Sequence, residues 1–250
     1  MDDDFRAAPV IYFHGLPGSE RELALVNMQE CEVPRVLDPL DFEYFSQRTG
    51  AHSPAKVVGF SLGAFSAVKL AASRPDVVSE LVLISAAAPL ETGSFLDEMA
   101  GAPVFRAARA SAAAFAALTA AQAFAAHVFP EFLLKRMFAK SCDAEKAILK
   151  DPAARRCLTD GLRHSLWHSA PMYRRAVTEY VQPWQSDLSE VQCPCRVFHG
   201  ELDDWVPLGM AETLIDSLPS GSTFQVEKNL GHYSTLVKVL PNVLKRSANP

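Results

Sequence analysis

The sequence has no excess of basic residues, because 24 Lys and Arg face 29 Asp and Glu in 250 residues, a net charge of −5. A chain without a basic surplus offers phosphates no general binding surface, so we expect no nucleic-acid partner. Charged residues are few, at 21%, whereas hydrophobic residues make up 49% of the chain. This composition excludes wholesale disorder and provides enough apolar side chains for a folded core.

The start of the chain, Met-Asp-Asp-Asp-Phe, lacks the basic residues and the apolar core of a secretory signal. The cysteines number five, and no second pair accompanies Cys193 and Cys195. That Cys-Pro-Cys segment therefore matches neither a redox Cys-x-x-Cys motif nor half of a zinc site. We expect reduced cysteines in a cytoplasmic protein, without a metal or another cofactor.

Residues 110–130 lack charged side chains over about the length of a membrane span. Most of the segment is alanine, however, and single Ser, Thr, Gln and His residues interrupt it. We therefore predict a helix packed on two sides inside the protein rather than a membrane span. Its larger apolar residues form two nearly opposite sets at helical spacing: Phe115, Leu118 and Phe129, and Phe124 and Val128.

Short apolar runs alternate with helical patterns near both ends of the chain. Helical patterns cover Leu62–Ser73 and Gly209–Ser217, and each ends before a proline. Nearly continuous apolar runs are typical of parallel strands covered on both faces, so we predict an α/β fold with a mostly parallel sheet and helices on both faces. The predicted strands are Val10–Phe13, Val33–Leu37, Val57–Phe60, Leu81–Ser85, Arg196–His199 and Thr223–Glu227.

The alternation stops between residues 90 and 185, where no strand-like run occurs and alanine is frequent. We predict an all-helical cap inserted at 90–185 into a core formed by residues 1–89 and 186–250. The cap contains 12 Lys and Arg against 9 Asp and Glu, whereas the rest of the chain contains 12 against 20. The near-neutral charge is thus an average over a +3 cap and a −8 core.

A Gly-x-Ser-x-Gly motif follows the predicted strand Val57–Phe60 and precedes a helix rich in small residues. In such a strand-to-helix turn, the central Ser61 is strained and exposes its hydroxyl, while the flanking glycines make room for nearby backbone. The start of the helix favours developing negative charge. Ser61 is therefore a candidate nucleophile.

Three further segments follow predicted strands and supply partners for Ser61. After Val10–Phe13, His-Gly-Leu-Pro-Gly can place the Leu16 N–H together with the Leu62 N–H as an oxyanion hole. After the fifth strand, Asp203 and Asp204 are alternative acids that could orient a histidine. After the last strand comes His232, 29 residues beyond the first of these acids.

The order Ser, Asp, His, with each residue after a strand, resembles the α/β-hydrolase family over essentially the whole chain. The resemblance implies Ser61 as nucleophile, His232 as base, Asp203 as acid with Asp204 as runner-up, and Leu16 and Leu62 as oxyanion donors. It implies mostly structural roles for His14 and His199. Only nine residues precede the first strand, so the antiparallel strands that usually open this family's sheet are expected to be absent.

The predicted function is hydrolysis of an ester, thioester or related small acyl substrate through an acyl-enzyme. The same residues are compatible with a carbon–carbon bond hydrolase, an acyltransferase or an aminopeptidase. A non-catalytic binding or receptor module of the same fold is the alternative from another class. The oligomeric state is left open.

The cap is expected to cover Ser61 and to form most of the substrate pocket. Two histidines, His164 and His168, lie one helical turn apart, but no third metal ligand accompanies them. Aromatic candidates for the pocket lining are Phe115, Phe124, Phe129, Phe138, Trp167 and Tyr173, although simple helix packing is the alternative for most of them. Candidates for meeting an anionic substrate group, or for a solvated basic face, are Arg106, Arg109, Arg163 and Arg174.

Overall fold

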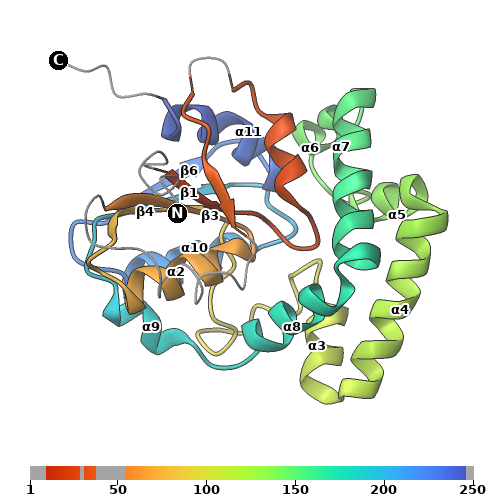
Figure 1. The fold of residues 1–250 in the computed structure, drawn as a ribbon, viewed down its shortest axis with the longest axis horizontal. Helices are drawn as coiled ribbons and strands as arrows, with labels where there is room; N and C mark the ends of the chain where they lie inside the picture. Colours follow the sequence, from red (N-terminus) through yellow and green to blue (C-terminus); the bar gives the residue numbers. More distant parts are fainter. Residues whose placement is uncertain (1–9, 29–30, 38–53, 246–250) are drawn as a thin grey trace, which may run out of the picture.

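The computed structural model describes residues 10–28, 31–37 and 54–245. Its centre is a sheet of six parallel strands in the order β2-β1-β3-β4-β5-β6 (Figure 1). The prediction of a mostly parallel α/β sheet is confirmed. The strands are β1 (Val10–Phe13), β2 (Arg35–Leu37), β3 (Ala55–Phe60), β4 (Val78–Ile84), β5 (Cys195–Gly200) and β6 (Thr223–Glu227).

Burial along the strands follows their position in the sheet. All four residues of β1 and the last four of β3 and of β4 are buried, since these strands have neighbours on both sides and helices over both faces. β6, at the edge, buries only its final residue. The predicted strand at 33–37 is two residues too long, because β2 begins at Arg35 and Val33 is 78% exposed.

Helices cover both faces of the sheet. In Figure 1, α2 (Gly63–Ser73), α9 (Gln185–Glu190) and α10 (Leu208–Ser217) lie on one face, and α11 (His232–Val243) lies on the other. α2 is buried along most of its length because small residues let it pack closely against the strands. The prediction about missing antiparallel strands concerns residues 1–9, which lie outside the described residues.

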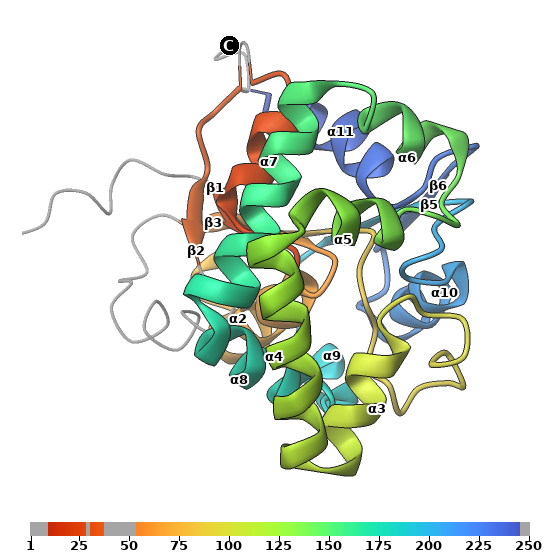
Figure 2. The same ribbon diagram turned by 90° about the vertical axis from the view of Figure 1, so that its right-hand side faces the viewer.

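A group of helices from the middle of the chain lies beside this core, and we call it the helical insertion (Figure 2). Its α6 (Asp143–Ile148) packs against α11 of the core, and its α7 (Pro152–Arg163) packs against η2 (Glu20–Leu25), a 3₁₀ helix that follows β1. The predicted domain boundaries at residues 90 and 185 stay a prediction. The insertion comprises α3 (Ala102–Ala110), α4 (Ala112–Val128), α5 (Pro130–Met137), α6 (Asp143–Ile148), α7 (Pro152–Arg163), the π-helix η3 (His164–His168) and α8 (Ala170–Tyr180).

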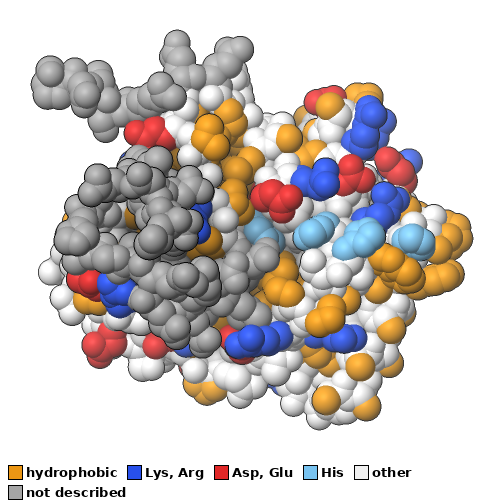
Figure 3. Space-filling model, in the orientation of Figure 1, with side chains coloured by type: hydrophobic (Ala, Val, Ile, Leu, Met, Phe, Trp, Pro, Cys, Tyr) orange, Lys and Arg blue, Asp and Glu red, His pale blue; other side chains and the backbone are white. Residues whose placement is uncertain are grey.

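The prediction that the 110–130 helix packs on two sides is wrong. Phe115 is buried, but the opposite side of α4 is exposed, with Phe124 at 57% and Val128 at 44%. Phe129, which the spacing placed beside Phe115, is also exposed, and it lies just beyond the last residue of α4. Figure 3 shows hydrophobic side chains at this edge of the molecule, next to basic and histidine side chains.

No single helix in the described ranges has the length and apolarity needed to cross a membrane. α4 and α5 meet that criterion only when taken together, and they are bent by 117° where they join.

The register of the sheet brings the carboxyl ends of its strands to one edge. Phe13 of β1 pairs with Gly59 of β3, and Gly59 pairs with Leu83 of β4. Gly200, the last residue of β5, pairs with Glu227, the last of β6. The segments that follow these strands therefore gather at this edge, where ligands bind in open α/β sheets.

Candidate active site

Ser61 occupies a strained turn between β3 and α2. Its φ of 56° lies in the left-handed region, which costs a non-glycine residue about 1–2 kcal/mol. The turn persists because the Ser61 N–H donates to the Ile84 carbonyl (3.1 Å) and the Ser61 carbonyl accepts from the Ala87 N–H (3.2 Å). These bonds tie the strained residue to the end of β4.

The two glycines of the motif permit close backbone contacts. A Cβ on Gly63 would lie 2.3 Å from the Phe13 carbonyl oxygen, and one on Gly59 would lie 2.7 Å from the Cα of Ala64. Neither position tolerates a side chain, so α2 packs directly behind β1 and β3. The sequence motif thus has the tight strand-to-helix geometry that we predicted for it. The prediction that the turn exposes the serine hydroxyl is wrong, since Ser61 is only 5% exposed.

Three of the predicted site residues form a continuous chain of hydrogen bonds. The Ser61 Oγ lies 2.9 Å from Nε2 of His232, and Nδ1 of the same ring lies 2.8 Å from Oδ2 of Asp203. The other oxygen of Asp203 accepts bonds from the N–H groups of Trp205 and Val206, each at 2.9 Å. Both Asp203 oxygens are therefore occupied, and the carboxylate is fixed in orientation.

Of the two candidate acids, the structure brings Asp203 and not Asp204 to the histidine. One oxygen of Asp204 accepts a hydrogen bond from the Ser141 hydroxyl (3.2 Å) of the helical insertion. Its other oxygen is buried without a hydrogen-bond partner among the described residues. Burial raises the pKa of Asp204.

The pKa values of His232 and Asp203 shift in opposite directions. Burial alone would lower the pKa of His232, but the Asp203 charge and hydrogen bond, assisted by Glu145 and Glu22, raise it overall. Burial alone would raise the pKa of Asp203, but His232, His199 and backbone N–H donors lower it. The pair therefore favours an ionised carboxylate and an imidazole that accepts a proton readily.

The loop after β1 lies against the Ser61 turn. A Cβ on Gly15 would come within 3.3 Å of the Ser61 Cβ. Within the part of the chain described, the N–H groups of Leu16 and Leu62 make no hydrogen bond. Leu62 directly follows Ser61 in the chain, and Leu16 directly follows Gly15, which packs against Ser61.

The histidines at the strand ends, His14 and His199, are both buried. The His14 Nδ1 lies 2.8 Å from the carbonyl oxygen of Gly15. The His199 Nε2 lies 2.9 Å from the carbonyl oxygen of Val206, and burial lowers the pKa of this histidine. Both rings contact the backbone of the site loops, and neither reaches Ser61.

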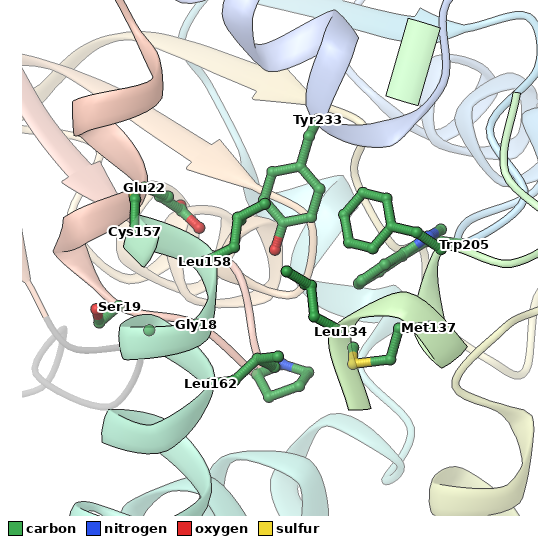
Figure 4. A pocket seen from close by; sticks show the side chains of 13 residues that line it. Gly18, Ser19, Glu22, Leu134, Met137, Cys157, Leu158, Leu162, Trp205 and Tyr233 are labelled. Atoms are coloured by element: carbon green, nitrogen blue, oxygen red, sulfur yellow. The ribbon is translucent and has the colours of Figure 1, made fainter. Parts of the chain in front are cut away.

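A small cavity of about 10 Å³ lies between the insertion and the core (Figure 4). It adjoins the hydrogen-bonded chain, since Trp205 in its wall stacks on the His232 ring with centroids 5.3 Å apart. Space of this size holds one water molecule at most. Its lining consists of Pro17, Gly18, Ser19, Glu22, Leu134, Met137, Phe138, Cys157, Leu158, Gly161, Leu162, Trp205 and Tyr233.

Of the six aromatic residues proposed for the pocket, only Phe138 lines this cavity. Phe124, Phe129 and Trp167 are largely exposed, while Phe115 and Tyr173 are buried elsewhere in the insertion. None of the four arginines proposed for anion binding contributes to the lining. The spacing of residues on a helix gives its faces, but tertiary packing decides which face is covered.

Two buried glutamates were not singled out by the sequence. Glu145, on α6, accepts hydrogen bonds from the Tyr233 N–H (3.1 Å) and the Ser234 N–H (2.6 Å) at the start of α11. Glu22, on η2, accepts from the Tyr12 hydroxyl (2.6 Å) and from the N–H of Gly15 (2.9 Å). Burial raises the pKa of both carboxyls. Neither belongs to a motif, so only their tertiary surroundings reveal them.

The described ranges contain no group of three or more His, Cys, Asp or Glu side chains placed to hold a metal ion. The His164 and His168 rings lie 6.5 Å apart, and His164 contacts the Ser169 hydroxyl (3.2 Å).

Solved structures with the same fold cover nearly the whole chain. An enol-lactonase from Burkholderia xenovorans LB400 is 16% identical, with a TM-score of 0.63, over 94% of this chain and 89% of that one. A thermophilic esterase from Thermogutta terrifontis is 19% identical, with a TM-score of 0.62, over 94% and 87%. MenH from S. aureus is 15% identical, with a TM-score of 0.61, over 94% and 92%. At these identities the similarity shows the fold.

No curated protein sequence matches the chain. A family model described as the alpha/beta hydrolase fold matches residues 30–239, which is most of the chain. The parallel sheet and the nucleophile-type turn after β3 agree with that match. The chain therefore belongs to the alpha/beta hydrolase fold family.

Proposed function

We propose that this protein is a serine hydrolase that cleaves an ester, thioester or related small acyl substrate through an acyl-enzyme. The observation that carries the proposal is the chain of hydrogen bonds from Ser61 through His232 to Asp203, at 2.9 and 2.8 Å. A serine hydroxyl is a weak nucleophile until a positioned base accepts its proton. Here His232 is that base, and its Nδ1 is hydrogen-bonded to Asp203, which keeps the ring in position.

Each residue has a defined role in this mechanism. As the Ser61 oxygen attacks the acyl carbon, its proton passes to the Nε2 of His232, and Asp203 stabilises the imidazolium that forms. The same proton then moves to the leaving group as the bond to the acyl carbon breaks. Water, deprotonated by His232, finally attacks the acyl-enzyme and releases Ser61.

The negative charge on the acyl oxygen needs donors in place before the attack. We assign this role to the N–H groups of Leu16 and Leu62, which flank Ser61 and make no other hydrogen bond within the described residues. Each such donor is worth about 3 kcal/mol of barrier in comparable sites. The helical insertion acts as the cap in this proposal, because its residues form one side of the cavity beside His232. We place the enzyme in the cytoplasm, in keeping with its five free cysteines.

The experiment is labelling with a fluorophosphonate probe combined with turnover of p-nitrophenyl esters. Wild-type protein should be labelled and should hydrolyse short esters, and Ser61→Ala should lose both properties. Ser73→Ala is the matched control, because it removes a hydroxyl at the far end of α2, the helix that follows the Ser61 turn. Folded wild-type protein that is neither labelled nor active on any ester would overturn the proposal and favour a binding module.

A further inference from the structure

Glu22 has one oxygen with a structural role and one without any partner. Its Oε1 accepts hydrogen bonds from the Tyr12 hydroxyl and from the N–H of Gly15. Its Oε2 is buried and has no hydrogen-bond partner within the described residues, although the whole residue is only 3% exposed. Burying a carboxyl oxygen without a hydrogen-bond donor costs free energy of folding, so the position of Oε2 calls for an explanation.

The unpartnered oxygen belongs to the cavity between the insertion and the core. Figure 4 shows the Glu22 carboxyl group and the Tyr233 hydroxyl directed into the same space. The Oε2 atom lies 3.3 Å from the position that a Cβ on Gly18 would occupy. Because residue 18 is glycine, no side chain stands between the cavity and this oxygen on that side. The rest of the wall is largely apolar, with Leu134 and Leu162 among its residues. An apolar pocket with a few convergent polar groups is typical of a ligand site.

The cavity lies next to the atoms that would react. Pro17 in its wall directly follows Leu16, which is assigned to the oxyanion hole, and Trp205 stacks on His232. The cavity is therefore one residue removed from His232, which is hydrogen-bonded to Ser61. The cavity as seen is too small for a substrate group, and α5 and α7 of the insertion form its outer wall. For a substrate group to enter, these two helices must move outward, as lids do in many enzymes.

We propose that Glu22 is a specificity-determining residue, whose Oε2 accepts a hydrogen bond from a hydroxyl or ammonium group of the substrate. This inference rests on the proposed hydrolase function and names the class of substrate: small esters or thioesters with a hydrogen-bond donor away from the scissile bond. A site with a buried unpaired acceptor strongly rejects an analogue without the donor, because the acceptor then remains unsatisfied.

The test compares matched pairs of esters in wild-type protein, Glu22→Gln and Glu20→Gln. One arm uses p-nitrophenyl esters of hydroxyalkanoic or aminoalkanoic acids against plain alkanoic acids of equal length. The other arm places the hydroxyl or amine on the alcohol side of acetate esters. The readout is the ratio of kcat/KM for the donor-bearing ester to that for its plain partner. Both esters of a pair are measured with the same variant. A loss of activity that affects all esters alike, such as one from a weakened Gly15–Glu22 hydrogen bond, therefore cancels in the ratio.

In wild-type protein, kcat/KM for the donor-bearing ester should be about tenfold or more above that for its plain partner. We expect this in one of the two arms, at the chain length that brings the donor to Glu22. In Glu22→Gln an amide nitrogen replaces Oε2 while the remaining oxygen still serves Tyr12 and Gly15. The NH₂ group cannot accept a hydrogen bond from an ammonium group, so the ratio for the amine-bearing esters should collapse toward unity. A substrate hydroxyl can accept from the NH₂ group, so the ratio for the hydroxyl-bearing esters should fall less. Glu20→Gln is the matched control, since Glu20 is exposed on the same 3₁₀ helix and should keep the wild-type ratio.

Plain esters hydrolysed with no preference for a donor in either arm would overturn this inference and leave the proposed function intact. Should Glu22→Gln fail to fold, the wild-type ratios decide alone. If no ester is hydrolysed, the proposed function fails, and calorimetric titration of Ser61→Ala tests the inference by itself. N-methylamides of hydroxyalkanoic and alkanoic acids serve as ligands, and equal affinities for the two would overturn it.

Discussion

Replacing Asp203 with asparagine should change the tautomer of His232 while leaving the shape of the site intact. The Oδ1 atom of Asp203 accepts two backbone N–H bonds, from Trp205 and Val206. An asparagine must keep its single oxygen there, so its NH₂ group faces Nδ1 of His232. Because an NH₂ group cannot accept a hydrogen bond, Nδ1 becomes the acceptor and the ring proton moves to Nε2.

With the proton on Nε2, the ring can no longer accept the proton of Ser61. The imidazolium that would form during attack also loses the carboxylate 2.8 Å away. In serine hydrolases of this design the corresponding change lowers kcat by about 10⁴-fold, or about 5.5 kcal/mol of barrier. We expect a loss of that order for Asp203→Asn.

The assay is the pH dependence of p-nitrophenyl ester hydrolysis. The Asp203 charge raises the pKa of His232, and the histidine must be neutral to act as a base. Activity therefore rises with pH as His232 loses its proton. In Asp203→Asn the pKa of His232 falls, so the acidic limb of the profile should move to lower pH while the plateau drops.

Asp204→Asn provides the matched control, because its carboxylate contacts Ser141 rather than His232. It should cost less than about tenfold in kcat, since it leaves the bonds to His232 and Ser61 in place. A kcat for Asp203→Asn within tenfold of wild type would refute this reasoning. A larger loss in Asp204→Asn than in Asp203→Asn would refute it too.

Three other substitutions test the structure around the site. Glu145→Gln should lower stability by about 1–3 kcal/mol in chemical denaturation, because one of two N–H groups at the start of α11 loses its acceptor. The negative charge of Glu145 raises the pKa of His232, so its removal should also shift the acidic limb of the pH–activity profile to lower pH. A profile with an unchanged acidic limb would contradict this. Gly63→Ala should cost more than about 100-fold in activity, because its Cβ meets backbone at 2.3 Å. In Gly161→Ala the Cβ meets nothing closer than 3.6 Å, so this variant should keep the stability of the wild-type protein. Ser61→Gly should abolish labelling yet raise the free energy of unfolding by about 1 kcal/mol, as glycine adopts a φ of 56° without strain, and a loss of stability would contradict that account.

The local patterns predicted the fold and the positions of the main site residues. Parallel strands covered on both faces need apolar residues on both faces. Val10–Phe13 and Val57–Phe60 meet this requirement as nearly continuous apolar runs. The turn at Ser61 needs glycines at fixed offsets, so it too is visible in the sequence. The resemblance to the α/β-hydrolase family favoured Asp203 over Asp204, and the structure brings Asp203 to His232.

The helical insertion was predicted less well, because the packing of a helix depends on segments outside the local sequence pattern. Periodicity gives the faces of α4, but it does not say that Phe124 and Val128 remain exposed while Phe115 is buried. Partners from distant segments decide that burial.

The sequence by itself determined the alternation of strands and helices, the strained serine turn and the chain order of Ser61, Asp203 and His232. Each of these depends on residues that are close together or on the fixed direction of parallel strands. Only the tertiary structure decided that Glu145 caps α11 and that Glu22 faces a cavity beside His232. Neither glutamate carries a local sign of burial, because α5 and α7 beside Glu22, and the start of α11 beside Glu145, are distant from it in the sequence.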